Sequence, residues 1–156
     1  MKSTILIFLF TFQFFNFSIE KSAYYHALKS DSIHILNSMI KQLDEEAPNA
    51  LNRAYKGTLI AKTSSFENKP AQKIKMFKTG VTLLENEISN SPKNVEYRFL
   101  RLTIQENCPK ILNYNKNTNE DAQIITSEFS HLNKELKNII LDYANNSALL
   151  NSSNLK

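Results

Sequence analysis

The amino-acid sequence predicts an all-α protein of about seven antiparallel helices joined by short turns. Three observations lead to this fold class. The 156 residues include only two glycines and four prolines, whereas β-sandwiches and α/β folds need many glycines at their turns. Apolar residues recur at spacings of three and four, which is the period of an amphipathic helix. Serine, asparagine and aspartate, which cap helix ends well, separate the apolar runs.

Each expected helix rests on local spacing or on a turn signal. The expected ranges are 20–29, 33–43, 48–62, 70–90, 95–106, 118–129 and 132–143. A Ser-Asp-Ser capping sequence separates the first two, and the second has apolar residues every three or four positions. Pro48 suits the first turn of the third helix. The third helix also presents a face of small residues around Gly57, which permits close approach of a neighbouring helix.

The later helices are expected to pack in different ways. The fourth is the longest, with an apolar stripe through five turns and lysines and glutamates on its other face. The fifth has apolar residues on more than one side, so we expect it to be central. An irregular segment at 107–117 precedes the sixth, which repeats apolar residues from Ala122 to Phe129. The seventh has five apolar positions between Leu132 and Tyr143.

The first 18 residues predict export from the cytoplasm. Lys2 is followed by an apolar run from Ile5 to Phe17, an order typical of a signal peptide. A transmembrane helix needs about 20 apolar residues, so this run is short for a permanent span. We expect a signal peptide at 1–18, a single all-α domain at 19–144 and a flexible polar tail at 145–156. The expected location is the periplasm or cell envelope, with secretion from the cell as a second destination, and an uncleaved N-terminal anchor is the alternative.

Charge and cysteine content exclude some classes of function. The net charge of +4 is too mild for the footprint of a nucleic-acid-binding protein. Cys108 is the single cysteine, so the chain has no internal disulfide. No cofactor or metal motif is present, and no catalytic motif predicts an enzyme. Four lysines on the fourth helix predict a solvated face, with weak contact to anionic lipid or polysaccharide as the alternative: Lys69, Lys73, Lys75 and Lys78.

The segment 51–104 resembles the tetratricopeptide pattern of paired helices. The matching residues are Ala54, Tyr55, Gly57, Gly80, Leu84 and Pro92. The family repeat is close to 34 residues, whereas this segment is longer between Gly57 and Pro92 and has no clear second copy, so it is tetratricopeptide-like rather than a full helical repeat array. The sequences AYKGTLIAK and VEYRFLRLTIQENCPKILNYNKN are similar to parts of small exported helical proteins of Gram-negative bacteria, a family without an assigned activity. This resemblance implies a fold and a compartment but no active site.

Four residues are candidates for a binding surface. Arg98 and Arg101 suit the carboxylates of an acidic peptide, and Tyr55 and Tyr114 belong to a residue type that favours binding surfaces. For both arginines an internal ion pair with Glu106 or Asp121 is the favoured interpretation, and the peptide anchor comes second. We expect a non-catalytic domain that binds a protein or peptide partner in the cell envelope and touches membrane only transiently. The alternative is a small-ligand binding protein or an uncharacterised enzyme with a site near Arg98, Glu106 and Tyr114.

Three other residue groups suggest chemistry that we consider less favoured than a structural role. Cys108 and His131 are a possible nucleophile and base, although a buried, inert thiol is expected. His26, Asp31 and His34 contain metal-binding types without a standard ligand spacing. The loop 113–121 alternates polar residues as calcium loops do, but it lacks the glycine and the glutamate of that motif.

Overall fold

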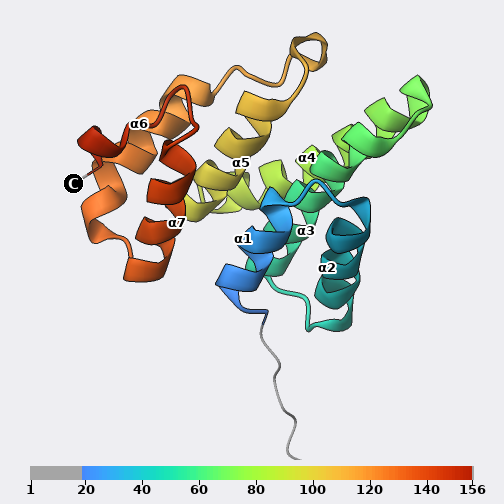
Figure 1. The fold of residues 1–156 in the computed structure, drawn as a ribbon, viewed down its shortest axis with the longest axis horizontal. Helices are drawn as coiled ribbons and strands as arrows, with labels where there is room; N and C mark the ends of the chain where they lie inside the picture. Colours follow the sequence, from blue (N-terminus) through green and yellow to red (C-terminus); the bar gives the residue numbers. More distant parts are fainter. Residues whose placement is uncertain (1–18, 156) are drawn as a thin grey trace, which may run out of the picture.

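The computed structural model describes residues 19–155, and in that range the chain forms seven α-helices and no strand (Figure 1). The helices are α1 (Lys21–Lys29), α2 (Ile33–Glu45), α3 (Ala50–Thr63), α4 (Pro70–Asn90), α5 (Val95–Asn107), α6 (Thr118–Glu128) and α7 (Lys134–Ala144). Four 3₁₀ turns accompany them: η1 (Ser64–Phe66), η2 (Lys110–Leu112), η3 (Phe129–His131) and η4 (Ser152–Asn154). The all-α prediction is confirmed. The predicted signal peptide lies outside the described residues, and no helix within 19–155 has the length and apolar character needed to cross a membrane.

Asparagine side chains fix the starts of three helices. The Oδ1 atoms of Asn49, Asn94 and Asn133 each accept a hydrogen bond from the backbone N–H three residues later, at 2.8, 3.1 and 2.9 Å. These bonds satisfy N–H groups that have no partner within the helix. The starts expected at 48 and 132 are therefore wrong by two residues. Each of these helices begins after its capping asparagine, at Ala50 and Lys134.

Helix α5 is the central helix, as the sequence predicted. Figure 1 shows it between the α3–α4 pair on one side and α6 with α7 on the other. Eleven of its thirteen residues are buried, from Val95 to Gln105, and they include charged side chains. A helix buried on all sides has to find partners for those charges in the neighbouring helices.

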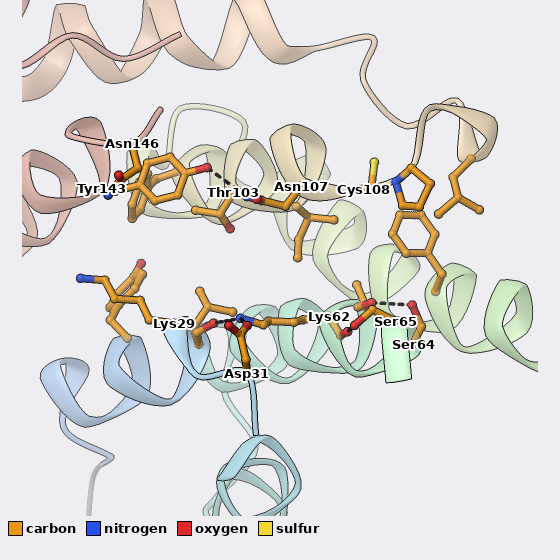
Figure 2. Close-up of a pocket in the computed structure, with 18 of the residues that line it drawn as sticks. Lys29, Asp31, Lys62, Ser64, Ser65, Thr103, Asn107, Cys108, Tyr143 and Asn146 are labelled. Atoms are coloured by element: carbon orange, nitrogen blue, oxygen red, sulfur yellow. Dashed lines mark hydrogen bonds and ion pairs between the residues drawn. The ribbon is translucent and has the colours of Figure 1, made fainter. Parts of the chain in front are cut away.

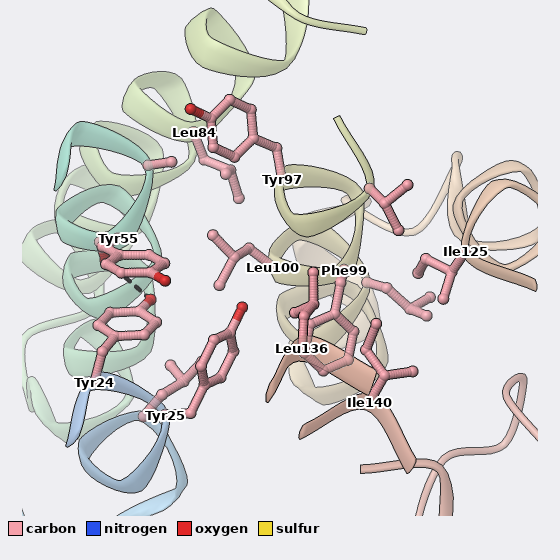
Figure 3. Packing of buried hydrophobic residues seen from close by; sticks show 14 of the residues in the cluster. Tyr24, Tyr25, Tyr55, Leu84, Tyr97, Phe99, Leu100, Ile125, Leu136 and Ile140 are labelled. Carbon is pink, nitrogen blue, oxygen red and sulfur yellow. Dashed lines mark hydrogen bonds between the residues drawn. The ribbon is translucent and has the colours of Figure 1, made fainter. Parts of the chain in front are cut away.

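Aromatic residues of α1 and α3 fill the core on one side of α5 (Figure 3). The rings of Tyr24 and Tyr55 stack with centroids 3.6 Å apart and planes 7° from parallel, and Tyr25 meets both rings edge-on. The Tyr24 hydroxyl donates to the carbonyl of Tyr55, and the hydroxyls of Tyr25 and Tyr55 donate to Glu96. Leu136 and Ile140 of α7 and Ile125 of α6 form the other side of the core.

The segment after α7 is part of the packed domain. Leu150 and Leu155 are buried in the main core, 2% and 6% exposed. The carboxylate of Glu106 accepts hydrogen bonds from the Ser147 hydroxyl and the Ala148 backbone N–H, each at 2.9 Å. The expected flexible tail at 145–156 is therefore wrong for the residues up to 155, and the domain extends beyond 144.

Helices α3 and α4 pack closely because glycines face each other at their contact. A Cβ placed on Gly80 would lie 2.5 Å from the carbonyl oxygen of Gly57 and even closer to the backbone nitrogen of Ala61. A Cβ on Gly57 would lie 2.7 Å from the carbonyl oxygen of Gly80. These contacts are with backbone, which does not move aside as a flexible side chain does. The small-residue face predicted for the third helix is thus the site of its closest packing.

We expect Gly80→Ala to destabilise the protein. Alanine gains about 1 kcal/mol of helix propensity over glycine, but a methyl forced into packed backbone costs about 1–3 kcal/mol. Because the added methyl would meet backbone atoms of Gly57 and Ala61, we take the steric cost to be about 3 kcal/mol. After the gain in helix propensity is subtracted, the free energy of unfolding should fall by about 2 kcal/mol. Urea unfolding gives the value, with the exposed Thr82→Ala on the same helix as the control. A Gly80→Ala protein that is more stable than the wild type would contradict the close packing.

Candidate functional site

A cleft of about 650 Å³ runs between α1 and α3 on one side and α5 and α7 on the other (Figure 2). Its lining is mostly apolar, and α4 and η2 contribute at one end. The apolar lining residues are Leu28, Ala61, Phe77, Phe99, Ile104, Leu112 and Ile139. Sites for small molecules and peptide side chains usually have 300–1,000 Å³ and this kind of lining. The cleft is therefore the best candidate for a binding site in the described part of the chain.

Two lysines bring charge into the cleft. Lys29 of α1 forms an ion pair with Asp142 of α7, which bridges the two walls. The Lys62 Nζ donates to the carbonyl oxygen of Leu28 at 2.6 Å, while its closest carboxylate, Asp31, is 3.8 Å away with a side chain 99% exposed. Burial lowers the pKa of the Lys62 ammonium, and Asp31 offsets this only in part. Lys62 is thus a cation whose neutralisation within the protein is incomplete.

Polar groups of α5 and α7 lie opposite these lysines. The Asn107 side-chain amide donates to the Thr103 carbonyl at 2.8 Å and lies 3.4 Å from the Tyr143 hydroxyl. Tyr143 in turn donates to Glu106 at 2.8 Å, and burial, aided by that carboxylate, raises the pKa of the Tyr143 phenol. These groups fix the rim of the cleft by hydrogen bonds, so its shape is largely preformed.

Cys108 lies in the cleft wall as an ordinary thiol. Its Sγ is 3.6 Å from the Gln105 carbonyl oxygen, and burial raises the thiol pKa. A nucleophilic cysteine needs the opposite shift and a base nearby. His131 does not line the cleft, and its Nδ1 lies 3.4 Å from Glu128 on the surface. The structure does not bring the proposed nucleophile and base together.

The two candidate arginines bind one buried carboxylate instead of facing a partner. Asp121 of α6 is fully buried, and its oxygens accept hydrogen bonds from Arg98 at 3.1 Å and from Arg101 at 2.7 Å through two nitrogens. Burial alone would lower the pKa of Arg101, but Asp121 and Glu85 raise it. The internal ion pair favoured for the arginines is confirmed, with Asp121 as the partner. The less favoured peptide anchor finds no support, because both arginine side chains are buried against internal partners.

The candidate tyrosines also belong to internal contacts. Tyr55 is 1% exposed and donates to Glu96 at 2.6 Å, so it cannot meet a partner. Tyr114 donates to Glu85 at 2.6 Å, and Glu85 also binds Arg101 at 3.0 Å. The structure therefore links Arg98, Arg101 and Tyr114 through shared carboxylates, but none of the four candidates lines the cleft.

The alternative site near Arg98, Glu106 and Tyr114 is not assembled either. Arg98 binds Asp121, Tyr114 binds Glu85, and Glu106 binds Tyr143 and the segment after α7. Each side chain has its own partners, so no common site exists for these three. The small-ligand alternative depends instead on the cleft.

No cluster of ligand side chains supports a metal site in the described part of the chain. Within residues 19–155, no three His, Cys, Asp or Glu side chains come together as metal ligands do. In particular, His26, Asp31 and His34 do not form such a group. In the calcium-like loop, Asp121 is paired with two arginines and the carboxylate of Glu120 lies 3.1 Å from Arg98, so both acidic groups already face a cation of the protein.

The cleft residues carry no signal in the sequence that would single them out. They come from five helices, and their side chains are ordinary apolar residues at helical spacing.

No family model matches the chain, and neither a curated protein nor a solved structure is significantly similar to it. The tetratricopeptide-like pattern and the bacterial resemblance therefore stay predictions. A proposal for the function therefore has to rest on the geometry of the cleft and its surroundings.

We expect Asp121→Asn to lower the free energy of unfolding by about 3 kcal/mol, because two buried guanidinium groups lose the carboxylate that neutralises them. Glu120→Gln is the matched control: its carboxylate is 3.1 Å from Arg98, but its side chain is 51% exposed. Exposed pairs of this kind contribute less than about 1 kcal/mol. Chemical denaturation measures both. Equal effects of the two substitutions would show that the buried pair is not important for stability.

Alkylation of Cys108 tests the inert-thiol interpretation. Because burial raises the thiol pKa, little reactive thiolate forms near pH 8. Iodoacetamide should therefore modify the folded protein about tenfold more slowly than the urea-unfolded chain. Mass spectrometry of the single cysteine peptide follows the rate. A folded protein that reacts faster than the unfolded chain would favour an activated nucleophile.

Proposed function

We propose that this protein is a non-catalytic binding domain of the cell envelope and that its cleft holds an apolar segment of a protein or peptide partner. The observation that carries the proposal is the cleft itself, with its apolar lining and preformed polar rim. Apolar lining supplies affinity by removing partner side chains from water. Polar groups on the rim, such as Asn107 and Lys62, supply direction to a bound backbone or carboxylate.

The preformed rim supports binding more than catalysis. The ion pair of Lys29 with Asp142 joins the two walls of the cleft. The hydrogen bonds of Asn107 to Thr103 and Tyr143 hold α5 and α7 together within one wall. A rigid site loses little freedom when a partner binds. The thiol in the wall has a raised pKa, which suits packing rather than attack on a substrate. The tetratricopeptide-like resemblance adds an analogy, because such helical pairs commonly bind peptides in a concave face.

The second candidate is a small apolar ligand, and the cleft volume of about 650 Å³ favours it. The two candidates differ in what occupies the cleft in cells. Mass spectrometry of the native protein under gentle conditions detects a bound small molecule by its added mass. Crosslinking from the cleft to a peptide detects a protein partner.

We expect photocrosslinking in cells to capture a partner from the cleft. A photoreactive residue placed at Ser65 or Asn146, both in the cleft lining, should give the same crosslinked protein. The same residue at Gln123, which lies on α6 outside the cleft, should not. Mass spectrometry identifies the partner and reads the N-terminus of the mature chain in the same run.

Paired substitutions connect the captured partner to the cleft. Ile139 lines the cleft and Ile124 does not, although both are partly buried isoleucines packed against the core. Ile139→Asp should lower partner capture about tenfold, since it places a charge in an apolar site. Ile124→Asp should leave it unchanged at equal helix content by circular dichroism. Loss of capture in both variants, or in neither, would count against the cleft as the binding site.

A further inference from the structure

Exposed apolar side chains gather at one end of the molecule. Within the described residues, six large hydrophobic side chains are exposed, and three of them lie on η1, the start of α4 and η2. They are Phe66, Ile74 and Ile111. Ile111 is 92% exposed, so it contributes almost nothing to the fold. An isoleucine that is almost wholly in water needs an explanation beyond packing.

These three segments form one surface. Leu112, beside Ile111, lines the same end of the cleft as Lys73 and Phe77 of α4 and Ser65 of η1. The ring of Tyr114, in the same loop, packs edge-on against Phe77 with centroids 5.5 Å apart. The loop of η2 is thereby held against the first half of α4. We call this surface the loop-end patch.

The loop-end patch is also rich in positive charge. The segments 66–79 and 108–117 contain six lysines and only one acidic residue, Glu67, although the whole chain has a net charge of only +4. The lysines are Lys69, Lys73, Lys75, Lys78, Lys110 and Lys116. Within residues 19–155, none of them has a carboxylate within 4 Å.

The lysines of the first three helices differ from those of the patch in this respect, whereas three later lysines in the described part of the chain, Lys93, Lys134 and Lys137, also have no carboxylate within 4 Å. All five lysines of α1, α2 and α3 have an acidic partner within that distance: Lys21, Lys29, Lys41, Lys56 and Lys62. The charge of the loop-end patch is therefore not used inside the protein. An unneutralised cationic surface with an apolar side chain at its tip is complementary to an anionic lipid surface, which offers phosphate groups above a hydrocarbon layer.

We propose that the loop-end patch docks the protein on an anionic phospholipid surface, with Ile111 inserted among the lipid chains and the lysines over the headgroups. This docking is independent of the partner proposed for the cleft. Because Lys73 and Leu112 belong to both features, docking places one end of the cleft at the membrane.

The chain offers a local reporter for this contact, because it contains no tryptophan. Ile111→Trp in the full chain should shift its fluorescence to shorter wavelength with vesicles of equal parts phosphatidylcholine and phosphatidylglycerol, and much less with phosphatidylcholine alone. Leu149→Trp is the control, since Leu149 is a 39% exposed leucine in the segment after α7. It should show no shift. The reporter locates the contact even if another segment also binds the vesicles.

Charge substitutions in the Ile111→Trp protein test the lysines. Lys75→Gln with Lys78→Gln should weaken vesicle binding about twenty-five-fold, since each lysine near an anionic surface contributes about fivefold. Lys93→Gln with Lys134→Gln, two exposed lysines outside the loop-end patch, should change it little. Added salt should weaken binding by the wild-type patch.

The results that overturn the proposal are distinct. An unshifted Ile111→Trp, or an equal shift at Leu149→Trp, places the contact elsewhere on the chain. An equal shift with neutral vesicles removes the role of the lysines. In the first case the loop-end patch is left as a surface for an acidic protein partner, and the cleft proposal is unaffected by either result.

Discussion

The buried charges of α5 determine how the other helices are arranged around it. A buried charge without a partner costs several kcal/mol, so each has to be met by a neighbouring element. Glu96 binds Lys21 of α1 and Tyr55 of α3, and Arg101 binds Glu85 of α4 and Asp121 of α6. At the other end, Glu106 holds α7 and the segment that follows it. Polar side chains of α5 thereby hold most of the other helices, and shifting α1, α4 or α6 would break a charge pair.

The cleft is a consequence of this arrangement. Helices α1 and α3 attach near the start of α5, whereas α7 attaches near its end, which leaves a space along the side of α5 between them (Figure 2). Tyr25 and Phe99, with centroids 5.8 Å apart, close the space toward the core. Because the walls are positioned by polar contacts, the shape of the cleft depends little on its apolar lining. The apolar side chains of the cleft also pack in the core, and their open side lines a space that a ligand can enter.

The sequence predicted the helices because helix formation is encoded locally. Apolar period and capping asparagines act within a few residues, so all seven ranges were found and their errors are confined to the ends. The tail was mispredicted because its stabilising acceptor, Glu106, is 41 residues before Ser147. The sequence predicted an internal ion pair for the arginines. It did not distinguish Asp121 from Glu106 as the acidic partner, because that choice depends on how the helices pack. The cleft had no local signal, since its residues converge from distant segments.

The residues whose types most suggest binding or catalysis in the sequence are ones that stabilise the fold. Arg98, Arg101 and Tyr55 each have internal partners, so removing any of them would alter stability before it altered binding. A side chain available to a ligand has to be one whose interactions are incomplete in the protein. By that criterion the strongest residues are Lys62, which has only a distant carboxylate, and Ile111, which has almost no contact at all. We therefore expect side chains with incomplete internal contacts, rather than side chains of a reactive type, to take part in the binding proposed for this protein.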